Sequence, residues 1–129
     1  MSQTTAQIHP TAVVSADVEI GKGVSIGPFA VVEGPGRIGE GTVIESHALI
    51  RPHVYLGKNN HVHPHAVLGG LPQDLGFDPA TVTRLEIGDG NTFREGVTIS
   101  RATREGLATV VGSGNYFMNN THFGHDGVM

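Results

Sequence analysis

Two histidines and an aspartate near the C-terminal end of the sequence are the residue types that acid–base chemistry requires. Residues 121–127 read THFGHDG, which places His122, His125 and Asp126 close together. An imidazole titrates near neutral pH and can act as a general base, and a neighbouring carboxylate can fix its tautomer and raise its basicity. Solvated histidines on a loop produce the same short pattern, so the motif alone leaves both interpretations open.

A second polar segment, PQD at residues 72–74, has side chains that can bind a ligand. Gln73 and Asp74 can form hydrogen bonds with sugar hydroxyls or with an amide. Proline and aspartate also favour ordinary turns, which is the alternative explanation for this segment.

The sequence is rich in histidine, and imidazoles are common zinc ligands. His47 and His65 are separated by three repeats of six and would stack on one face, and His61 and His65 share one side of an extended strip. The chain has no cysteine, and no carboxylate stands at a matching spacing. We therefore expect no metal site, and we interpret most histidines as outward-facing residues of a repeat. The eight histidines are His9, His47, His53, His61, His63, His65, His122 and His125.

The candidate residues must be positioned by a repeat of six residues. Every sixth residue from Ile8 to Leu68 is aliphatic, whereas an α-helix has a period near 3.6 and a flat strand a period of 2. Six residues form one short strand and one tight corner, and glycine after an aliphatic would supply the positive φ that a corner often needs. Such repeats are typical of parallel β-helices, whose turns must stack to bury their apolar side. The row is Ile8, Val14, Ile20, Ile26, Val32, Ile38, Ile44, Ile50, Leu56, Val62 and Leu68, and glycine follows at Gly21, Gly27, Gly39, Gly57 and Gly69.

The sixfold repeat is interrupted twice, at residues 69–86 and 101–109, and these interruptions divide the predicted domain into stacked coils and loops. Three strands would make one triangular coil, with neighbouring coils about 4.8 Å apart. Residues 69–86 are rich in proline, glycine and acidic residues and are predicted to be a loop, and residues 101–109 a shorter one. We therefore predict a disordered lead over residues 1–7 and one β-helix domain of about five coils over residues 8–129. Nothing near Met129 resembles a cap, so we expect this domain to be the N-terminal portion of a longer protein, or its open end to be covered in an assembly.

Composition excludes several other classes of protein. The net charge is −4 and the basic residues form no run, so nucleic acid is not an expected partner. No stretch approaches the roughly 18 apolar residues of a membrane span, and the first residues lack the apolar core of a secretory signal. We therefore expect a cytoplasmic protein without a membrane span.

Four segments together resemble a known enzyme family. They are the sixfold run, GGLPQDL at residues 69–75, TRLEIGDGNTFREGVTI at residues 83–99 and THFGHD at residues 121–126. In combination they are similar to the bacterial UDP-N-acetylglucosamine O-acyltransferases that begin lipid A synthesis. The resemblance implies an all-β, left-handed parallel β-helix of hexapeptide repeats that assembles as a homotrimer, with active sites in clefts between subunits.

The same resemblance implies a reaction and roles for individual residues. A 3-hydroxyacyl group would move from acyl carrier protein to the 3-hydroxyl of UDP-N-acetylglucosamine. His125 would be the general base, and Asp126 would hold its imidazole or help to order the site. Asp74 and His122 would contact the nucleotide sugar, and Gln73 is the further candidate for this role. No metal or organic cofactor is needed, because the thioester is already activated.

The sequence also departs from the family pattern. Ser100 stands where the family commonly has histidine, and Gly76 stands where it commonly has lysine, so two polar contacts are lost. The family's oxyanion-hole donor, acyl-chain ruler and C-terminal helices all lie beyond Met129. Loss of an oxyanion donor alone lowers a rate by about 100- to 1,000-fold. We therefore expect the 129-residue chain by itself to be weakly active or inactive.

Three other functions fit the repeat. The first is another hexapeptide acyltransferase that uses acetyl-CoA, which the PQDL segment disfavours. The second is a metal-dependent hydratase on the same scaffold, which requires an H-x4-H pair that the sequence lacks. The third is a non-catalytic trimeric scaffold, whose subunit contacts would use apolar residues outside the inward row. Those residues are Phe29, Val31, Leu49 and Tyr55.

Overall fold

Short parallel strands follow the sixfold repeat in the computed structural model, which describes residues 5–129. Residues 5–129 contain seventeen strands. The strands are β1 Gln7–Ile8, β2 Val13–Val14, β3 Val18–Ile20, β4 Ser25–Ile26, β5 Val31–Val32, β6 Gly36–Ile38, β7 Val43–Ile44, β8 Leu49–Ile50, β9 Val54–Leu56, β10 His61–Val62, β11 Val67–Gly70, β12 Arg84–Ile87, β13 Thr92–Phe93, β14 Thr98–Ser100, β15 Ala108–Val111, β16 Tyr116–Phe117 and β17 His122–Phe123.

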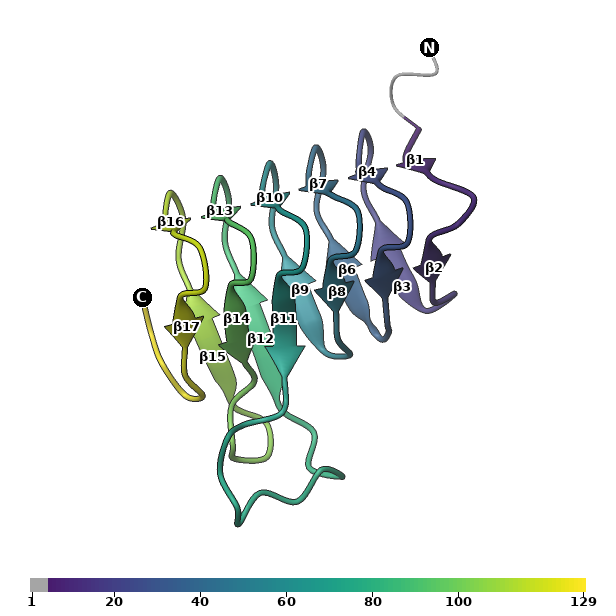
Figure 1. The fold of residues 1–129 in the computed structure, drawn as a ribbon. Helices are drawn as coiled ribbons and strands as arrows, with labels where there is room; N and C mark the ends of the chain where they lie inside the picture. Colours follow the sequence, from purple (N-terminus) through teal and green to yellow (C-terminus); the bar gives the residue numbers. More distant parts are fainter. Residues whose placement is uncertain (1–4) are drawn as a thin grey trace.

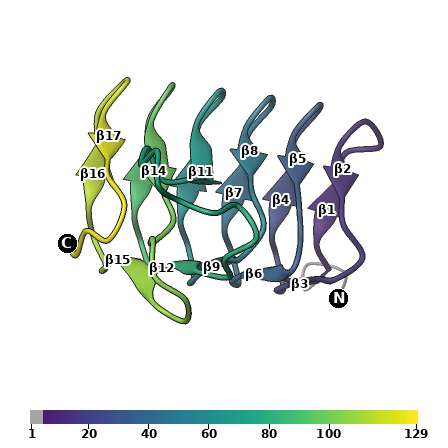
Figure 2. The ribbon, with the colours of Figure 1, turned by 90° about the horizontal axis from the view of Figure 1, so that it is seen from below.

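Every third strand belongs to the same parallel sheet. The first sheet has the order β1-β4-β7-β10-β13-β16, the second β17-β14-β11-β8-β5-β2, and the third β15-β12-β9-β6-β3. Ile8 pairs with Ile26 and Ile26 with Ile44, so one coil advances the chain by three repeats of six. The coils stack side by side from β1 to β17 (Figure 1), and the third sheet runs along one edge of the stack in Figure 2. The expected left-handed parallel β-helix is confirmed, with five complete coils and two strands of a sixth.

The sixfold aliphatic row forms the core of the coils. From Ile26 to Leu68 every member of the row is at most 1% exposed. In the first described coil Ile8 is 43% exposed, because among residues 5–129 a neighbouring coil packs against it from one side only. Phe93 and Phe117 continue the row after the first loop, and their rings stack with centroids 5.2 Å apart. Burial of each large apolar side chain contributes about 1.5–3 kcal/mol, so this row is the main stabilising feature of the fold.

The glycines that follow the row have a different role from the one expected. Of the five, only Gly69 has a positive φ, and the corners instead place residues such as Phe29 and His47 in this conformation. A Cβ on Gly39 would overlap the carbonyl group of Gly57 and lie 2.9 Å from the carbonyl oxygen of Leu56. The expectation that these glycines supply positive φ is therefore wrong for all but Gly69. They are needed because successive coils approach each other too closely for a side chain.

The two loops are shorter than the sequence suggested. β11 extends to Gly70 and β12 begins at Arg84, so the first loop spans residues 71–83 rather than 69–86. β14 ends at Ser100 and β15 begins at Ala108, so the second loop spans 101–107 rather than 101–109. The strands continue into the expected loops because their backbones pair with adjacent coils, including a bulged pairing of Gly70 with Ser100.

The expected disordered lead can be followed only in part. Its first residues, 1–4, lie outside the described residues. Its last residue, Gln7, is the first residue of β1 and pairs with Ser25. Within residues 5–129 no helix is long and apolar enough to cross a membrane.

A ladder of polar side chains runs through the interior beside the aliphatic row. Asn60 and Asn91 are each 1% exposed. Asn60 donates from Nδ2 to the carbonyl oxygen of Gly88 at 2.9 Å and accepts from the backbone N–H of Asn91 at 2.9 Å. Asn91 repeats the pattern one coil later and donates to the carbonyl oxygen of Gly112 at 2.8 Å. The side-chain amides therefore form hydrogen bonds with backbone groups at the corner of the coil, where those backbone groups have no partner in a strand.

We predict that Asn60→Ala destabilises the fold by about 2–4 kcal/mol, because it leaves two backbone hydrogen-bonding groups without a partner. Urea unfolding followed by circular dichroism measures this change. Asn119→Ala removes an exposed amide and should stay within about 0.5 kcal/mol of the parent chain. Equal unfolding midpoints for the two variants would contradict a structural role for the ladder.

Candidate active site

The segment that carries the predicted catalytic residues begins at the last strand. β17 pairs with β14, so that Thr98 lies opposite His122 and Ile99 opposite Phe123. The Thr98 hydroxyl and His122 Nδ1 are 2.8 Å apart and form a hydrogen bond. His122 is exposed at the outer face of its strand, where a ligand can reach its free ring nitrogen.

Asp126 is held in place by Thr103 of the second loop and by Thr109 of β15. Its carboxylate accepts hydrogen bonds from the backbone N–H of Thr103 at 2.8 Å and from the Thr103 hydroxyl at 2.6 Å. Its own backbone N–H donates to the Thr109 hydroxyl at 2.9 Å. Burial raises the pKa of Asp126, but the hydrogen bonds from Thr103 and the proximity of His125 outweigh burial and leave the pKa below its usual range. Asp126 is therefore ionised at neutral pH.

The His125 imidazole faces this carboxylate. His125 Nδ1 lies 3.2 Å from Asp126 Oδ2, and the side chains are 35% and 41% exposed. Because an ionised carboxylate can only accept, the contact favours the tautomer of the neutral ring that carries its hydrogen on Nδ1 and a lone pair on Nε2. This arrangement leaves Nε2 able to take a proton from a bound hydroxyl group.

The first loop buries Pro72 and places the side chains of Gln73 and Asp74 at its exposed surface. Asp74 accepts a hydrogen bond from the backbone N–H of Gly76 at 3.0 Å, and the N–H of Phe77 donates to the Asp74 carbonyl oxygen at 2.9 Å. Gln73 and Asp74 are both exposed. Within residues 5–129 no hydrogen bond or ion pair joins either of them to His122 or to His125. A single chain thus brings His125 and Asp126 together and leaves Gln73 and Asp74 on a separate loop.

The two loops lie side by side at one edge of the β-helix (Figure 1). The backbone N–H of Gly106 donates to the carbonyl oxygen of Val82 at 3.0 Å, and that of Val82 donates to the Glu105 carboxylate at 3.3 Å. The loop that carries Asp74 is therefore anchored to the loop that holds Asp126.

A cationic cavity lies at the base of the first loop, and sequence reasoning did not find it. Its lining includes Arg51, His53 and Arg101 together with Leu71 and Pro79 of the loop. Burial and the positive charge of Arg51 lower the pKa of Arg101. Burial and the charge of Arg101 likewise lower the pKa of His53, although Asp17 partly offsets this.

One side-chain nitrogen of Arg101 in this cavity lacks a hydrogen-bond acceptor among the described residues. Arg101 is 5% exposed, and the nitrogen without a partner is its Nε. The neighbouring Arg51 is paired with Glu33 at 2.8 Å. A buried guanidinium nitrogen without an acceptor is costly, so the cavity suits the anionic group of a ligand. No motif in the sequence signals this cavity, because Arg101 is brought to the base of the loop only by the pairing of Ser100 with Gly70 in the fold.

Comparison with known proteins agrees with the fold and with the repeat. The family model "Bacterial transferase hexapeptide (six repeats)" matches residues 5–34 and 35–70. The chain is 48% identical over 120 residues to an acyl-[acyl-carrier-protein]–UDP-N-acetylglucosamine O-acyltransferase from Akkermansia muciniphila, and this match covers 93% of the chain and 46% of the relative. A protein of the same name from Chlorobaculum parvum is 50% identical over 121 residues, which cover 94% of the chain and 46% of that relative. The chain thus spans about half the length of these relatives.

A solved structure gives the same result. The crystal structure of UDP-N-acetylglucosamine O-acyltransferase (LpxA) from Moraxella catarrhalis matches 95% of this chain with a TM-score of 0.91 and 38% identity, and the match covers 48% of that protein. The sixfold row, the stacked coils and the matched repeats all agree, and the chain belongs to the bacterial transferase hexapeptide (six repeats) family.

Proposed function

We propose that this chain serves in an acyltransferase that moves a 3-hydroxyacyl group from acyl carrier protein to the 3-hydroxyl of UDP-N-acetylglucosamine, the first step of lipid A synthesis. The observation that carries this proposal is the orientation of His125, whose Nδ1 faces the Asp126 carboxylate at 3.2 Å. The names of the relatives from A. muciniphila and C. parvum support the choice of both substrates.

In the proposed reaction His125 acts as general base and then as general acid. Its Nε2 removes the proton from the sugar 3-hydroxyl, and the oxygen attacks the thioester carbonyl carbon. The tetrahedral intermediate then breaks its carbon–sulfur bond, and the departing thiolate takes the proton back from the imidazolium. The Asp126 carboxylate stabilises the imidazolium between these steps. The thioester is already activated, so the reaction requires no metal and no organic cofactor.

Substrate binding is assigned to residues around the two loops. Gln73, Asp74 and His122 are proposed to contact the nucleotide sugar through hydrogen bonds. The cationic cavity at Arg51, His53 and Arg101 supports an anionic substrate, because UDP-N-acetylglucosamine carries a diphosphate. We also propose that the reaction takes place in the cytoplasm, since the first residues lack the apolar core of a secretory signal.

We further propose a homotrimer in which the active site lies in a cleft between neighbouring copies. Such an assembly would bring Asp74 toward His125 across the cleft, since the single chain leaves them unconnected. Exposed rings support contacts between copies: Phe29 is 57% exposed and stacks on His47 with ring centroids 5.3 Å apart. His47 stacks in turn on His65, which extends this surface over three coils.

A chimeric protein tests the proposed activity, because the chain spans about half of its relatives. In this chimera residues 1–129 replace the matching half of the A. muciniphila relative. Incubated with UDP-N-acetylglucosamine and 3-hydroxyacyl carrier protein, it should form the acylated UDP-sugar, detected by mass spectrometry. A folded, assembled chimera that transfers no acyl group would contradict the proposal, and transfer only from acetyl-CoA would favour the other hexapeptide acyltransferases.

A further inference from the structure

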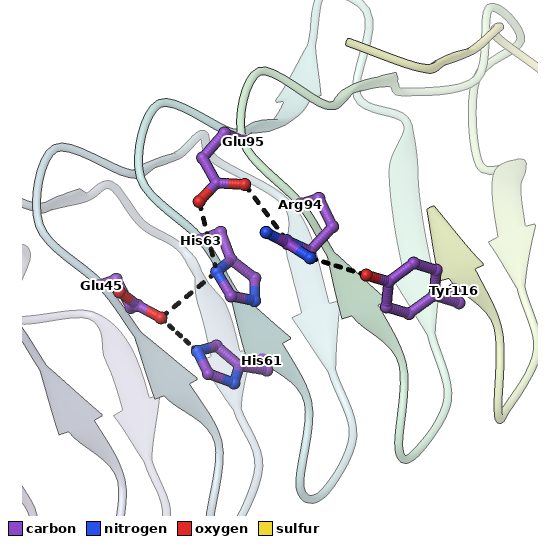
Figure 3. Close-up of polar contacts among 6 residues, drawn as sticks. All are labelled: Glu45, His61, His63, Arg94, Glu95 and Tyr116. Atoms are coloured by element: carbon purple, nitrogen blue, oxygen red, sulfur yellow. Dashed lines mark hydrogen bonds and ion pairs between the residues drawn. The ribbon is translucent and has the colours of Figure 1, made fainter. Parts of the chain in front are cut away.

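A carboxylate and two imidazoles meet on the outer face of the first sheet, away from the two loops. Glu45 directly follows β7, while His61 begins β10 and His63 directly follows it. Ile44 pairs with Val62, so Glu45 lies one coil below His63 and beside it. Figure 3 shows both imidazoles turned toward the Glu45 carboxylate.

The distances place three metal-ligand atoms within a small volume. Glu45 Oε2 contacts His61 Nε2 and lies 3.4 Å from His63 Nδ1. One ligand atom from each of the three residues lies within 4.8 Å of the others. Donors bound to zinc at 2.0–2.2 Å in tetrahedral geometry are about 3.3–3.6 Å apart, so the cluster is close to the required spacing.

We propose that Glu45, His61 and His63 form a binding site for a divalent transition-metal ion such as Zn²⁺. Two imidazoles and one carboxylate are a ligand set that zinc accepts with three protein ligands and one open position. The mixed nitrogen and oxygen donors disfavour Mg²⁺ and Ca²⁺, which prefer oxygen ligands alone. This proposal is independent of the acyltransferase function.

The surroundings of the cluster favour a bound cation. Arg94 donates to Glu95 at 3.1 Å and to the Tyr116 hydroxyl at 2.7 Å, so its positive charge is compensated locally (Figure 3). Glu95 also lies 3.8 Å from His63 Nδ1 and adds negative potential beside the site. Burial and the neighbouring His61 lower the pKa of His63, while Glu45 and Glu95 partly oppose this.

Metal binding requires a modest adjustment of the two rings. Their planes are nearly parallel, with an interplanar angle of 7° and centroids 4.1 Å apart. Because ligand lone pairs lie in the ring planes, at least one imidazole must tilt to point at a shared ion. The His61 side chain is 42% exposed and has room for this rotation. The exposed side also leaves the fourth position open to water or to an added ligand.

Metal titration of the untagged chain, first treated with a chelator, tests this site. Isothermal titration with Zn²⁺ at pH 7.5 should show one ion per chain, and Co²⁺ should give visible absorption typical of a nitrogen- and oxygen-ligated ion. His61→Ala/His63→Ala should weaken Zn²⁺ binding by at least about 100-fold, and Glu45→Gln by at least about tenfold. Absence of Zn²⁺ binding by the parent chain would overturn the site.

A second histidine pair provides the matched control. His47→Asn/His65→Asn removes two imidazoles that also stack between coils, and asparagine tolerates their positive φ of 63° and 67°. This variant should bind Zn²⁺ like the parent chain. Equal weakening by both double variants would overturn the assignment to His61 and His63.

A measurement on the parent chain keeps the test decisive even if a variant fails to fold. Zn²⁺ should shift the imidazole NMR signals of His61 and His63 and leave those of His9 and His122 in place. Shifts confined to other histidines would overturn the proposal.

Discussion

His125→Ala is expected to lower kcat for acyl transfer by about 100- to 10,000-fold in the chimeric enzyme, because alanine cannot take the proton from the sugar hydroxyl. The geometry behind this expectation is the contact of His125 Nδ1 with Asp126, which leaves Nε2 free for the substrate. Steady-state kinetics at saturating UDP-N-acetylglucosamine measures the effect. The variant should remain folded, since the His125 side chain is about one-third exposed and lies outside the aliphatic row.

His122 supplies the control for this experiment. His122→Gln removes an imidazole from the same short segment, and its proposed role is to bind the sugar rather than to move a proton. We therefore expect His122→Gln to raise KM with a much smaller change in kcat. An unchanged kcat in a folded His125→Ala chimera would remove His125 from the role of general base.

The second large effect is expected from Gly39→Ala, which should destabilise the fold by about 3 kcal/mol or more. The added methyl group would overlap the backbone carbonyl of Gly57 in the next coil, so two stacked coils would have to move apart. Overpacking a core typically lowers the free energy of unfolding by about 1–3 kcal/mol. Because the neighbour of Gly39 is rigid backbone, we expect the loss for this substitution to reach or exceed the upper value of that range. Thermal unfolding should show a melting temperature lower by roughly 10 °C.

Gly70→Ala is the matched control, because an added Cβ at Gly70 meets no atom within 4 Å. Gly70 also has no positive φ, so alanine introduces no backbone strain there. Its stability should stay within about 0.5 kcal/mol of the parent chain. Equal melting temperatures for Gly39→Ala and Gly70→Ala would show that coil spacing does not constrain Gly39.

Much of the fold could be predicted because the sixfold spacing of aliphatic residues is a local pattern of the sequence. A narrow triangular interior accepts one aliphatic side chain per strand, so burial imposes a period of six on the sequence. The register of the early coils, such as Ile26 with Ile44, follows from that period. The pairing of His125 with Asp126 could also be anticipated, because adjacent residues at a tight corner need no long-range register to meet.

Beyond the first loop the sixfold row resumes at Ile87, Phe93 and Ile99, so the period of six still marks the inward positions there. Val62 pairs with Phe93, and Phe93 pairs with Phe117, and both intervals are longer than the one that separates Ile26 from Ile44. The two loops supply the extra residues, and they carry no repeat from which their own conformation could be predicted. For this reason the contacts of Thr103 with Asp126 and the cavity at Arg101 were not visible in the sequence.

Residue order alone was enough to specify the coil, its apolar interior and the local pair at His125. The three-dimensional fold was needed to establish which outward-facing side chains become neighbours, as Glu45 does with His61 and His63. The physical reason is that burial constrains inward positions at every step of six. Outward positions are under no such constraint, and their contacts depend on how one coil is placed on the next.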